Sequence, residues 1–325
     1  MQRLLLTLAL IVTGLLAGYF LQRFFRAKIT EHEILLPRLR KFLQRFSILG
    51  LMPISFIGAF WIIPFGDLRI TLLPVIGSSV ALLGGGLGLG TAYLLKKTGS
   101  QKGVLFTCGS FSNIGSLGGL TSFLFFGEKG FALLALYKIF EELIYYGIGF
   151  PVARYFRLEG RDKGAADRRL VQLLKDPFLM VAGGSFLTGI CLNLSGIDRP
   201  QFYETLISLF VPTGVFLILV SIGLGMRFSS VGGYLVEGTA MFIIKFIILP
   251  LAAGTASYLL GLHRIQNGLP MKIVLIGSSM PVAFNALVVA SIYDLDLELA
   301  NSCWLITTCS MVVVLPWLYF LFSLF

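Results

Sequence analysis

The 325-residue chain is 56% hydrophobic and only 13% charged, and its mean hydropathy is +0.88. Soluble domains average about 25% charged residues, which they need to cover their surface, so this composition excludes a soluble protein. The net charge of +10 does not indicate nucleic-acid binding, because the Lys and Arg residues are concentrated in connections between apolar stretches.

Ten apolar stretches recur along the chain, each long enough to cross a bilayer core of about 30 Å. They cover residues 4–22, 43–64, 71–95, 104–125, 130–153, 178–195, 204–226, 234–261, 271–292 and 300–324. We therefore predict an all-α polytopic protein with ten transmembrane helices, integral to the cell membrane (inner or plasma membrane). A signal peptide is the alternative for the first stretch, but no small-x-small cleavage site follows it.

Most of the 26 Lys and Arg residues fall in the connections that follow the first, third, fifth and seventh stretches. Short connections rich in Lys and Arg stay on the cytoplasmic side of a membrane. We therefore expect both termini to lie outside the cytoplasm.

The fourth stretch contains GSFSNIGSLGGL at residues 109–120, in which small and hydroxylated residues interrupt apolar sequence. Lipid cannot hydrogen-bond free backbone groups, so unwound chain at membrane depth has to face protein or a water-filled cavity. The segment therefore predicts a broken helix beside an internal polar site, with Ser110, Ser112, Asn113 and Ser116 near it. Close helix packing through small residues is the alternative for the glycines, but it does not require the Asn113 amide.

The fifth stretch carries charges within LYKIFEELIYYG. Lys138, Glu141, Glu142 and Tyr145 are spaced so that one face of a continuous helix would present all four. A charge at the centre of a bilayer costs about 2.5–3.5 kcal/mol or more, so such residues face a cavity or a partner. Either Lys138 pairs with a glutamate and fixes helix packing, or Glu141 or Glu142 carries a coupling proton or helps to bind Na⁺.

The longest polar segment, RLEGRDKGAADRRLVQLLKDP at residues 157–177, divides the ten stretches into five and five. An odd number of spans in each half makes the second half enter the membrane in the opposite sense. We therefore expect two inverted five-helix repeats, residues 1–156 and 178–325, joined by a cytoplasmic polar linker. This architecture is typical of secondary transporters.

The eighth and ninth stretches add a second set of unusual residues. Lys245 is the one charge in MFIIKFIILPLAAG, where it can snorkel, hold a carboxylate of the fifth stretch or contact an anionic solute. The ninth stretch contains GSSMPVAFNAL at residues 277–287, again small, hydroxylated and interrupted, with Pro281 and Asn285. If the halves are inverted repeats, the two interrupted segments cross in mid-membrane and bring Asn113 and Asn285 to one site.

These residues carry a resemblance to a known family. NIGSLGGL at 113–120 and MPVAFNALVVASIYDLD at 280–296 resemble the two signature segments of the auxin efflux carrier family, and the stretch with Lys245 and Pro250 is similar to the family's pattern. That family belongs to the bile acid/sodium symporter-like superfamily and includes plant auxin exporters and bacterial dicarboxylate permeases. The resemblance covers the whole chain, and its most specific part is the PxAxNA segment at 281–286.

The resemblance implies ten helices in two inverted repeats, with broken helices 4 and 9 that cross, a transport domain that moves against a scaffold, and in many members a homodimer. By position it assigns Asn113 and Asn285 to the substrate site. The chain departs from the family's pattern at Leu120, where proline is common. We therefore expect Gly115 and the pair at 118–119 to hold the first crossover open instead.

We predict a secondary active transporter of a small organic anion, such as a mono- or dicarboxylate, that works by alternating access around the crossed helices. The residues expected to bind the substrate are Asn113, Asn285, Ser112, Ser116 and Pro281, and those expected in the charge network are Glu141, Glu142, Lys138 and Lys245. The alternatives are a passive channel, which the same broken helices would serve, and an integral membrane enzyme. The sequence lacks the clustered Asp, His or nucleophile–base residues typical of such enzymes, and it has no P-loop pattern for direct use of ATP.

The sequence indicates no cofactor, no firm metal site and no nucleic-acid partner. The expected partners are the organic anion, the lipid bilayer and a second copy of the chain. The coupling ion is expected to be H⁺ or Na⁺, and Na⁺ would bind near Ser110, Asn113, Ser279 and Asn285. The four cysteines lie within apolar stretches without CxxC spacing and are interpreted as small core residues.

Overall fold

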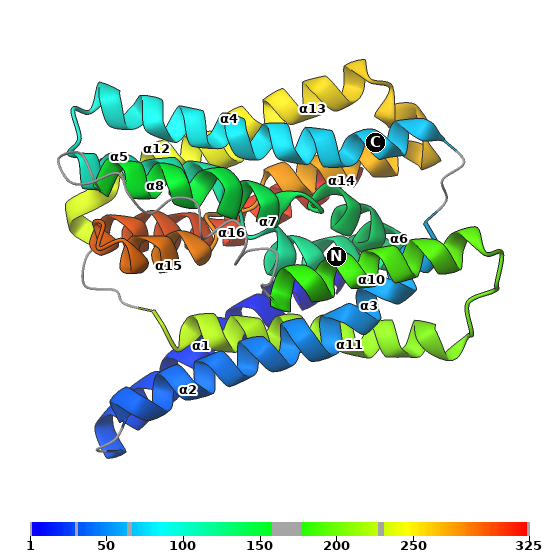
Figure 1. The fold of residues 1–325 in the computed structure, drawn as a ribbon, viewed down its shortest axis with the longest axis horizontal. Coiled ribbons are helices and arrows are strands. Elements are labelled where there is room, and N and C mark those ends of the chain that lie inside the picture. The colour runs from blue at the N-terminus through cyan, green and yellow to red at the C-terminus, as the bar shows by residue number, and fades with distance from the viewer. Residues whose placement is uncertain (1, 30–31, 64–66, 158–176, 227–230, 324–325) are drawn as a thin grey trace. The chain divides into compact units, whose positions relative to one another are not determined.

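The computed structural model describes residues 2–29, 32–63, 67–157, 177–226 and 231–323, and within these ranges the chain is all helical, without a strand (Figure 1). Residues 158–176, most of the predicted linker, therefore lie outside the described residues. Helical segments long and apolar enough to cross a membrane are Gln2–Lys28, Glu33–Trp61, Leu68–Leu94, Phe202–Gly223, Gly232–Leu259 and Leu297–Ser323. The remaining predicted spans consist of shorter or interrupted helices. These features support an all-α polytopic membrane protein.

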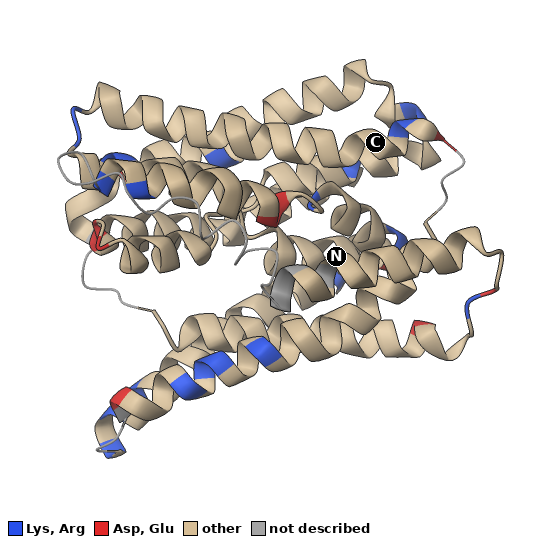
Figure 2. Ribbon diagram, viewed as in Figure 1, with Lys and Arg blue, Asp and Glu red and all other residues tan. Residues whose placement is uncertain are grey.

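The chain divides into two compact units, each assembled from both halves of the sequence. The first unit comprises Met1–Pro64, Gly119–Ala135 and Lys175–Met226. Its helices are α1 (Gln2–Lys28), α2 (His32–Arg45), α3 (Met52–Trp61), α10 (Pro177–Leu194), α11 (Phe202–Gly223) and most of α6 (Gly119–Tyr137). Within this unit α11 packs against α1, α2 and α3, and α10 packs against α3. Lys and Arg residues line α2, whereas most of α1, α10 and α11 is free of charge (Figure 2).

The second unit comprises Phe65–Gly118, Leu136–Leu174 and Arg227–Phe325. Its helices are α4 (Leu73–Leu94), α5 (Gly99–Ser110), α7 (Glu141–Ile144), α8 (Phe150–Arg157), α12 (Leu235–Ile243), α13 (Leu249–Leu259), α14 (Leu269–Ser278), α15 (Asn285–Ile292) and α16 (Leu297–Ser323). α5 packs between α4 and α8, and both α12 and α15 pack on α16. This unit holds both interrupted segments, so it contains the candidate site.

In three places a π-helical turn ends next to a proline. The turns are Phe46–Leu51 before Pro53, Tyr145–Gly149 before Pro151, and Ile244–Ile248 before Pro250. A proline within a helix has no N–H group, and its ring clashes with the carbonyl four residues earlier. The wider turn accommodates that clash, and turns of this kind often lie at functional sites. Two of them carry Tyr145 and Lys245, whose side chains point to the interrupted segments.

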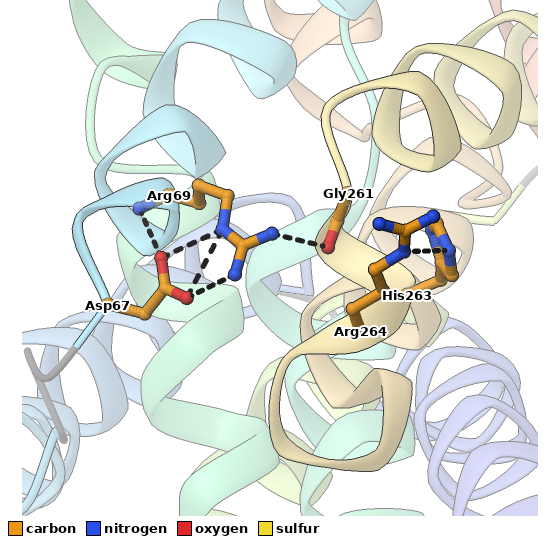
Figure 3. Close-up of polar contacts among 5 residues, drawn as sticks. All are labelled: Asp67, Arg69, Gly261, His263 and Arg264. Carbon is orange, nitrogen blue, oxygen red and sulfur yellow. Dashed lines mark hydrogen bonds and ion pairs between the residues drawn. The ribbon is translucent and has the colours of Figure 1, made fainter.

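An ion pair fixes the chain where α4 begins (Figure 3). Asp67 accepts hydrogen bonds from the backbone N–H of Arg69 (2.9 Å) and from its guanidinium (2.5 Å to Nη2), which caps the 3₁₀ turn Leu68–Leu72. Arg69 Nη1 also donates to the carbonyl of Gly261 (3.3 Å), beyond the end of α13. The hydrogen bonds from Arg69 lower the pKa of Asp67 to about 2, so this carboxylate stays charged at physiological pH.

Two interpretations of the sequence need correction. Cys191 and Cys309 are exposed rather than core residues, because they lie on outward faces of α10 and α16, whereas the other two cysteines are buried. The fifth stretch is also not a continuous helix. α6 ends at Tyr137, and a turn closed by a hydrogen bond from the Glu141 N–H to the Lys138 carbonyl (2.8 Å) precedes α7.

The close contact of α4 with α5 depends on glycine. A Cβ atom at Gly88 would lie 2.9 Å from the carbonyl carbon of Leu105 and still nearer to its oxygen, closer than real Cβ atoms approach a backbone. Gly90, on the exposed side of α4, has no atom within 4 Å of its Cβ position. Only the first of these two glycines is therefore required by packing.

We expect Gly88→Ala to lower the free energy of unfolding by about 1–3 kcal/mol, because α4 and α5 must move apart to admit the methyl group. Gly90→Ala is the matched control. It should leave the free energy of unfolding unchanged or raise it by about 0.4–1 kcal/mol, because alanine lowers the conformational entropy of the unfolded chain. Thermal unfolding of the purified protein in detergent measures both. Equal melting temperatures for the two variants would contradict the close contact.

Candidate functional site

The two interrupted segments lie side by side within the second unit. α5 ends at Ser110 and α14 ends at Ser278, and shortly beyond both ends the chain is no longer helical. Ser112 and Val282 pair there as an antiparallel bridge. Helical structure resumes after each break, in a π-helical turn that leads into α6 and in α15.

Backbone hydrogen bonds on both sides of this bridge join the segments. The Asn113 N–H donates to the Pro281 carbonyl (2.8 Å), and the Ala283 N–H donates to the Phe111 carbonyl (3.0 Å). They satisfy groups that the broken helices leave open, as buried backbone requires. The two hydrogen bonds are equivalent: in each, the residue after the bridge on one segment donates to the residue before the bridge on the other. The crossing therefore has a local two-fold symmetry.

Tyr145 joins the crossing to the charged residues of the fifth stretch. Its hydroxyl accepts a hydrogen bond from the Ser112 N–H (2.9 Å) and donates to Glu141 Oε1 (2.6 Å). The other carboxylate oxygen of Glu141 pairs with Lys138 Nζ at 2.7 Å. Tyr145 and Glu141 are both buried, so a change in the charge of Glu141 is felt at the crossing through a single hydroxyl group.

Lys245 reaches the same place from the opposite side. Its side chain is fully buried, and its Nζ donates to the carbonyls of Gly109 (2.6 Å) and Phe111 (3.1 Å) and to the Ser112 hydroxyl (2.8 Å). Among the described residues it has no ion pair, so it neither snorkels nor holds a carboxylate of the fifth stretch. The sequence could not reveal these partners, because they are carbonyl groups that only the helix break sets free.

The two asparagines have different surroundings. Asn113 is buried, and the Ser116 hydroxyl donates to its amide oxygen. Within the described part of the chain its amide nitrogen has no partner, so it is available as a donor. Asn285 begins α15 and is exposed. The symmetry of the bridge explains this difference, since it relates Asn113 to Ala283 and leaves Asn285 two residues further along.

A small cavity lies beside the crossing. Its volume is about 10 Å³, near the minimum that holds one water molecule, so this conformation has no room there for an organic anion. Its polar lining consists of Ser110, Ser112, Tyr137, Lys138, Glu141 and Tyr145. The hydroxyls of Ser110 and Tyr137 are buried without a hydrogen-bond partner in the described residues, so a water molecule or a proton entering the cavity would find partners there.

The remaining expected residues lie at the edges of this cluster. Ser279 caps α14, and its hydroxyl is buried without a partner among the described residues. Glu142 is half-buried on α7. In the part of the chain that the structure describes, no three His, Cys, Asp or Glu residues group to hold a metal ion. Of the four residues expected near Na⁺, Asn285 is exposed and the other three are buried.

Sequence reasoning missed two residues of the site. Thr307 of α16 accepts a hydrogen bond from the Val282 N–H (3.2 Å), the same role that Tyr145 has for the opposing segment. The ring of Tyr137 packs against Gly277 and fills the space that a side chain would need there. Its Cζ atom lies 3.0 Å from the position that a Cβ atom of residue 277 would have. The paired threonines at 307–308 within an apolar stretch are the signal that could have identified the first.

We expect Tyr145→Phe to lower the free energy of unfolding by about 1–3 kcal/mol, because it leaves the buried Ser112 N–H without an acceptor and removes a donor from Glu141. Tyr155→Phe on α8 is the matched control, since Tyr155 is 64% exposed. Thermal unfolding in detergent compares the two variants. If Tyr145→Phe melts with the control, the tyrosine link does not stabilise the crossing.

Comparison of the sequence with known proteins indicates a transporter. No family model matches the chain. A protein of Methanothermobacter thermautotrophicus named as an uncharacterized transporter is 26% identical over 251 residues, which cover 76% of this chain and 77% of the relative. A protein of the same description from Methanocaldococcus jannaschii is 28% identical over 235 residues, covering 69% of this chain and 70% of the relative. Together with the apolar spans, these relatives support an integral membrane transporter rather than an enzyme.

Proposed function

We propose that the chain is a secondary active transporter of a small organic anion, working by alternating access around the crossed segments. The observation that carries the proposal is the pair of helix breaks joined by the bridge between Ser112 and Val282. Unwound backbone of this kind persists in a membrane protein where it is buried in protein or lines a water-filled cavity, and in secondary transporters it lines the substrate site. The relatives named as transporters support the same class.

The chemistry around the crossing favours an anion. Helical structure starts anew after each break, and helix starts present N–H groups and the positive end of the helix dipole. Asn113 adds amide N–H donors. Lys138 Nζ, the ion-pair partner of Glu141, lies 3.1 Å from the Cβ position of Gly115, against the π-helical turn. A mono- or dicarboxylate matches this set of donors.

We infer that the chain has ten spans in two inverted repeats, residues 1–156 and 178–325, and belongs to the auxin efflux carrier family. The pairing of one interrupted helix from each half of the sequence supports the repeats, and the signature segments support the family. The compact unit that holds the crossing would be the moving domain, and the unit with α1, α3 and α11 the scaffold. Both termini outside and a homodimer remain predictions from the charge distribution and the resemblance.

Glu141 is our candidate for the coupling proton. Its carboxylate lies in the water-sized cavity between Lys138 and Tyr145, so protonation would weaken its pairing with the lysine and alter the hydrogen bond to the tyrosine. Both changes reach Ser112 in the crossing through one hydroxyl. Proton binding and movement of the crossing would thereby be linked.

The substrate site is tested in proteoliposomes and by thermal shift with a panel of mono- and dicarboxylates, indole acids and amino acids. We expect saturable uptake with counterflow, which a channel does not show. Asn113→Ala should weaken the apparent affinity by about tenfold or more, since a hydrogen bond to a charged group contributes about 1.5–3 kcal/mol. Ser79→Ala, on the exposed side of α4, is the control. Wild-type affinity in both Asn113→Ala and Asn285→Ala would remove the proposed site.

Coupling is tested with Glu141→Gln. We expect this variant to lose accumulation driven by a proton gradient and to retain counterflow, because glutamine keeps the shape of the side chain and one acceptor oxygen but cannot exchange a proton at this site. Glu142→Gln is the comparison, and it should keep the dependence on the gradient. Uptake is measured at several external pH values, with and without Na⁺. Unchanged pH dependence in both variants would exclude the two glutamates as proton carriers.

A further inference from the structure

The ammonium group of Lys245 occupies a position where a metal cation would be expected. Three oxygen atoms surround it, the carbonyls of Gly109 and Phe111 and the hydroxyl of Ser112, at 2.6–3.1 Å. All three belong to the end of α5 and the break that follows it. Backbone carbonyls and hydroxyls are the ligands that small hard cations prefer.

The carbonyl groups at the end of α5 need partners, and a positive charge suits them. Carbonyl groups in the last turn of a helix lack intrahelical partners and form the negative end of the helix dipole. Here they are buried, because Gly109, Ser110 and Phe111 are all inaccessible or nearly so. Water cannot satisfy them from bulk solvent, so a cation or a donor group from the protein has to do so.

Lys245 meets this requirement without exchanging with solvent. Its relative exposure is 0%, and the π-helical turn Ile244–Ile248, next to Pro250, directs it to the break. Charge-assisted hydrogen bonds of this length are about twice as strong as neutral ones. The end of α14 differs, since the hydroxyl of Ser279 is buried there without a hydrogen-bond partner among the described residues.

We propose that Lys245 is a built-in cation that takes the place of a bound alkali ion at the crossing, so that the unwound end of α5 is held together without Na⁺ or K⁺. The inference deepens the proposed function, on which it rests, by assigning the charge balance of that site to the chain itself. It follows that the variant without the lysine acquires a binding site for a small cation, formed by the same three oxygen atoms.

The test is the melting temperature of Lys245→Ala in detergent at constant ionic strength, with Na⁺, K⁺ or methylammonium replacing N-methyl-D-glucamine. We expect the variant to melt below the wild type in N-methyl-D-glucamine and to regain about 2–4 °C, saturably, with at least one of the small cations. The wild type and Lys272→Ala, a control on α14, should respond equally to all four cations. No selective recovery in Lys245→Ala would overturn the proposal.

Two further measurements apply if Lys245→Ala does not fold. Lys245→Met fills the space without a charge, so it should be less stable than the wild type and gain nothing from small cations; wild-type stability in this variant contradicts the proposal. In the wild type, a saturable stabilisation by Na⁺ that disappears in Ser112→Ala would show that a metal ion, not the lysine, occupies the break. None of these measurements depends on transport. The melting temperatures can therefore contradict the role of Lys245 while the Asn113→Ala affinity supports the substrate site, and the opposite result is equally possible.

Discussion

The candidate site depends on one physical constraint, that backbone polar groups released by a broken helix must find partners inside an apolar protein. Here two breaks satisfy one another through the hydrogen bonds around Ser112 and Val282. What remains is satisfied by side chains: Tyr145 and Thr307 accept from the two bridge residues, and Lys245 donates to the carbonyls of the first break. Leaving one of these buried backbone groups without a partner costs about 1–3 kcal/mol, so each of these partners stabilises the breaks.

Prolines place two of these partners. Pro151 and Pro250 each follow a π-helical turn, and these turns carry Tyr145 and Lys245. The widened turn changes the direction of the side chains within it relative to a regular helix. A residue that cannot donate a helix hydrogen bond thus determines, about five residues earlier, which side chain meets the crossing.

The same contacts connect charge to conformation. Glu141 lies between Lys138 and Tyr145, and Tyr145 touches the crossing directly. On the other face the side chain of Lys245 donates hydrogen bonds to the carbonyls at the end of α5. One side of the crossing therefore carries a carboxylate paired with Lys138, and the other carries a lysine that is part of the chain itself. Under the proposed function, a proton rather than a metal ion would be the variable charge during transport.

Much of this protein was determined by its sequence. Apolar stretches long enough for a bilayer identify the all-α membrane class, and the small polar residues at 109–120 and 277–287 mark the two breaks, because lipid tolerates such sequence only beside protein or water. Local spacing also indicated the pair Lys138–Glu141. The tertiary structure alone decided that Lys245 binds backbone carbonyls, that Tyr145 links Glu141 to the crossing, and that Asn113 is buried while Asn285 is exposed. Some of these contacts join segments more than 30 residues apart. The others depend on carbonyl groups that are free, and on a pairing of the two segments that forms, only when the helices are broken, and no local sequence pattern encodes either.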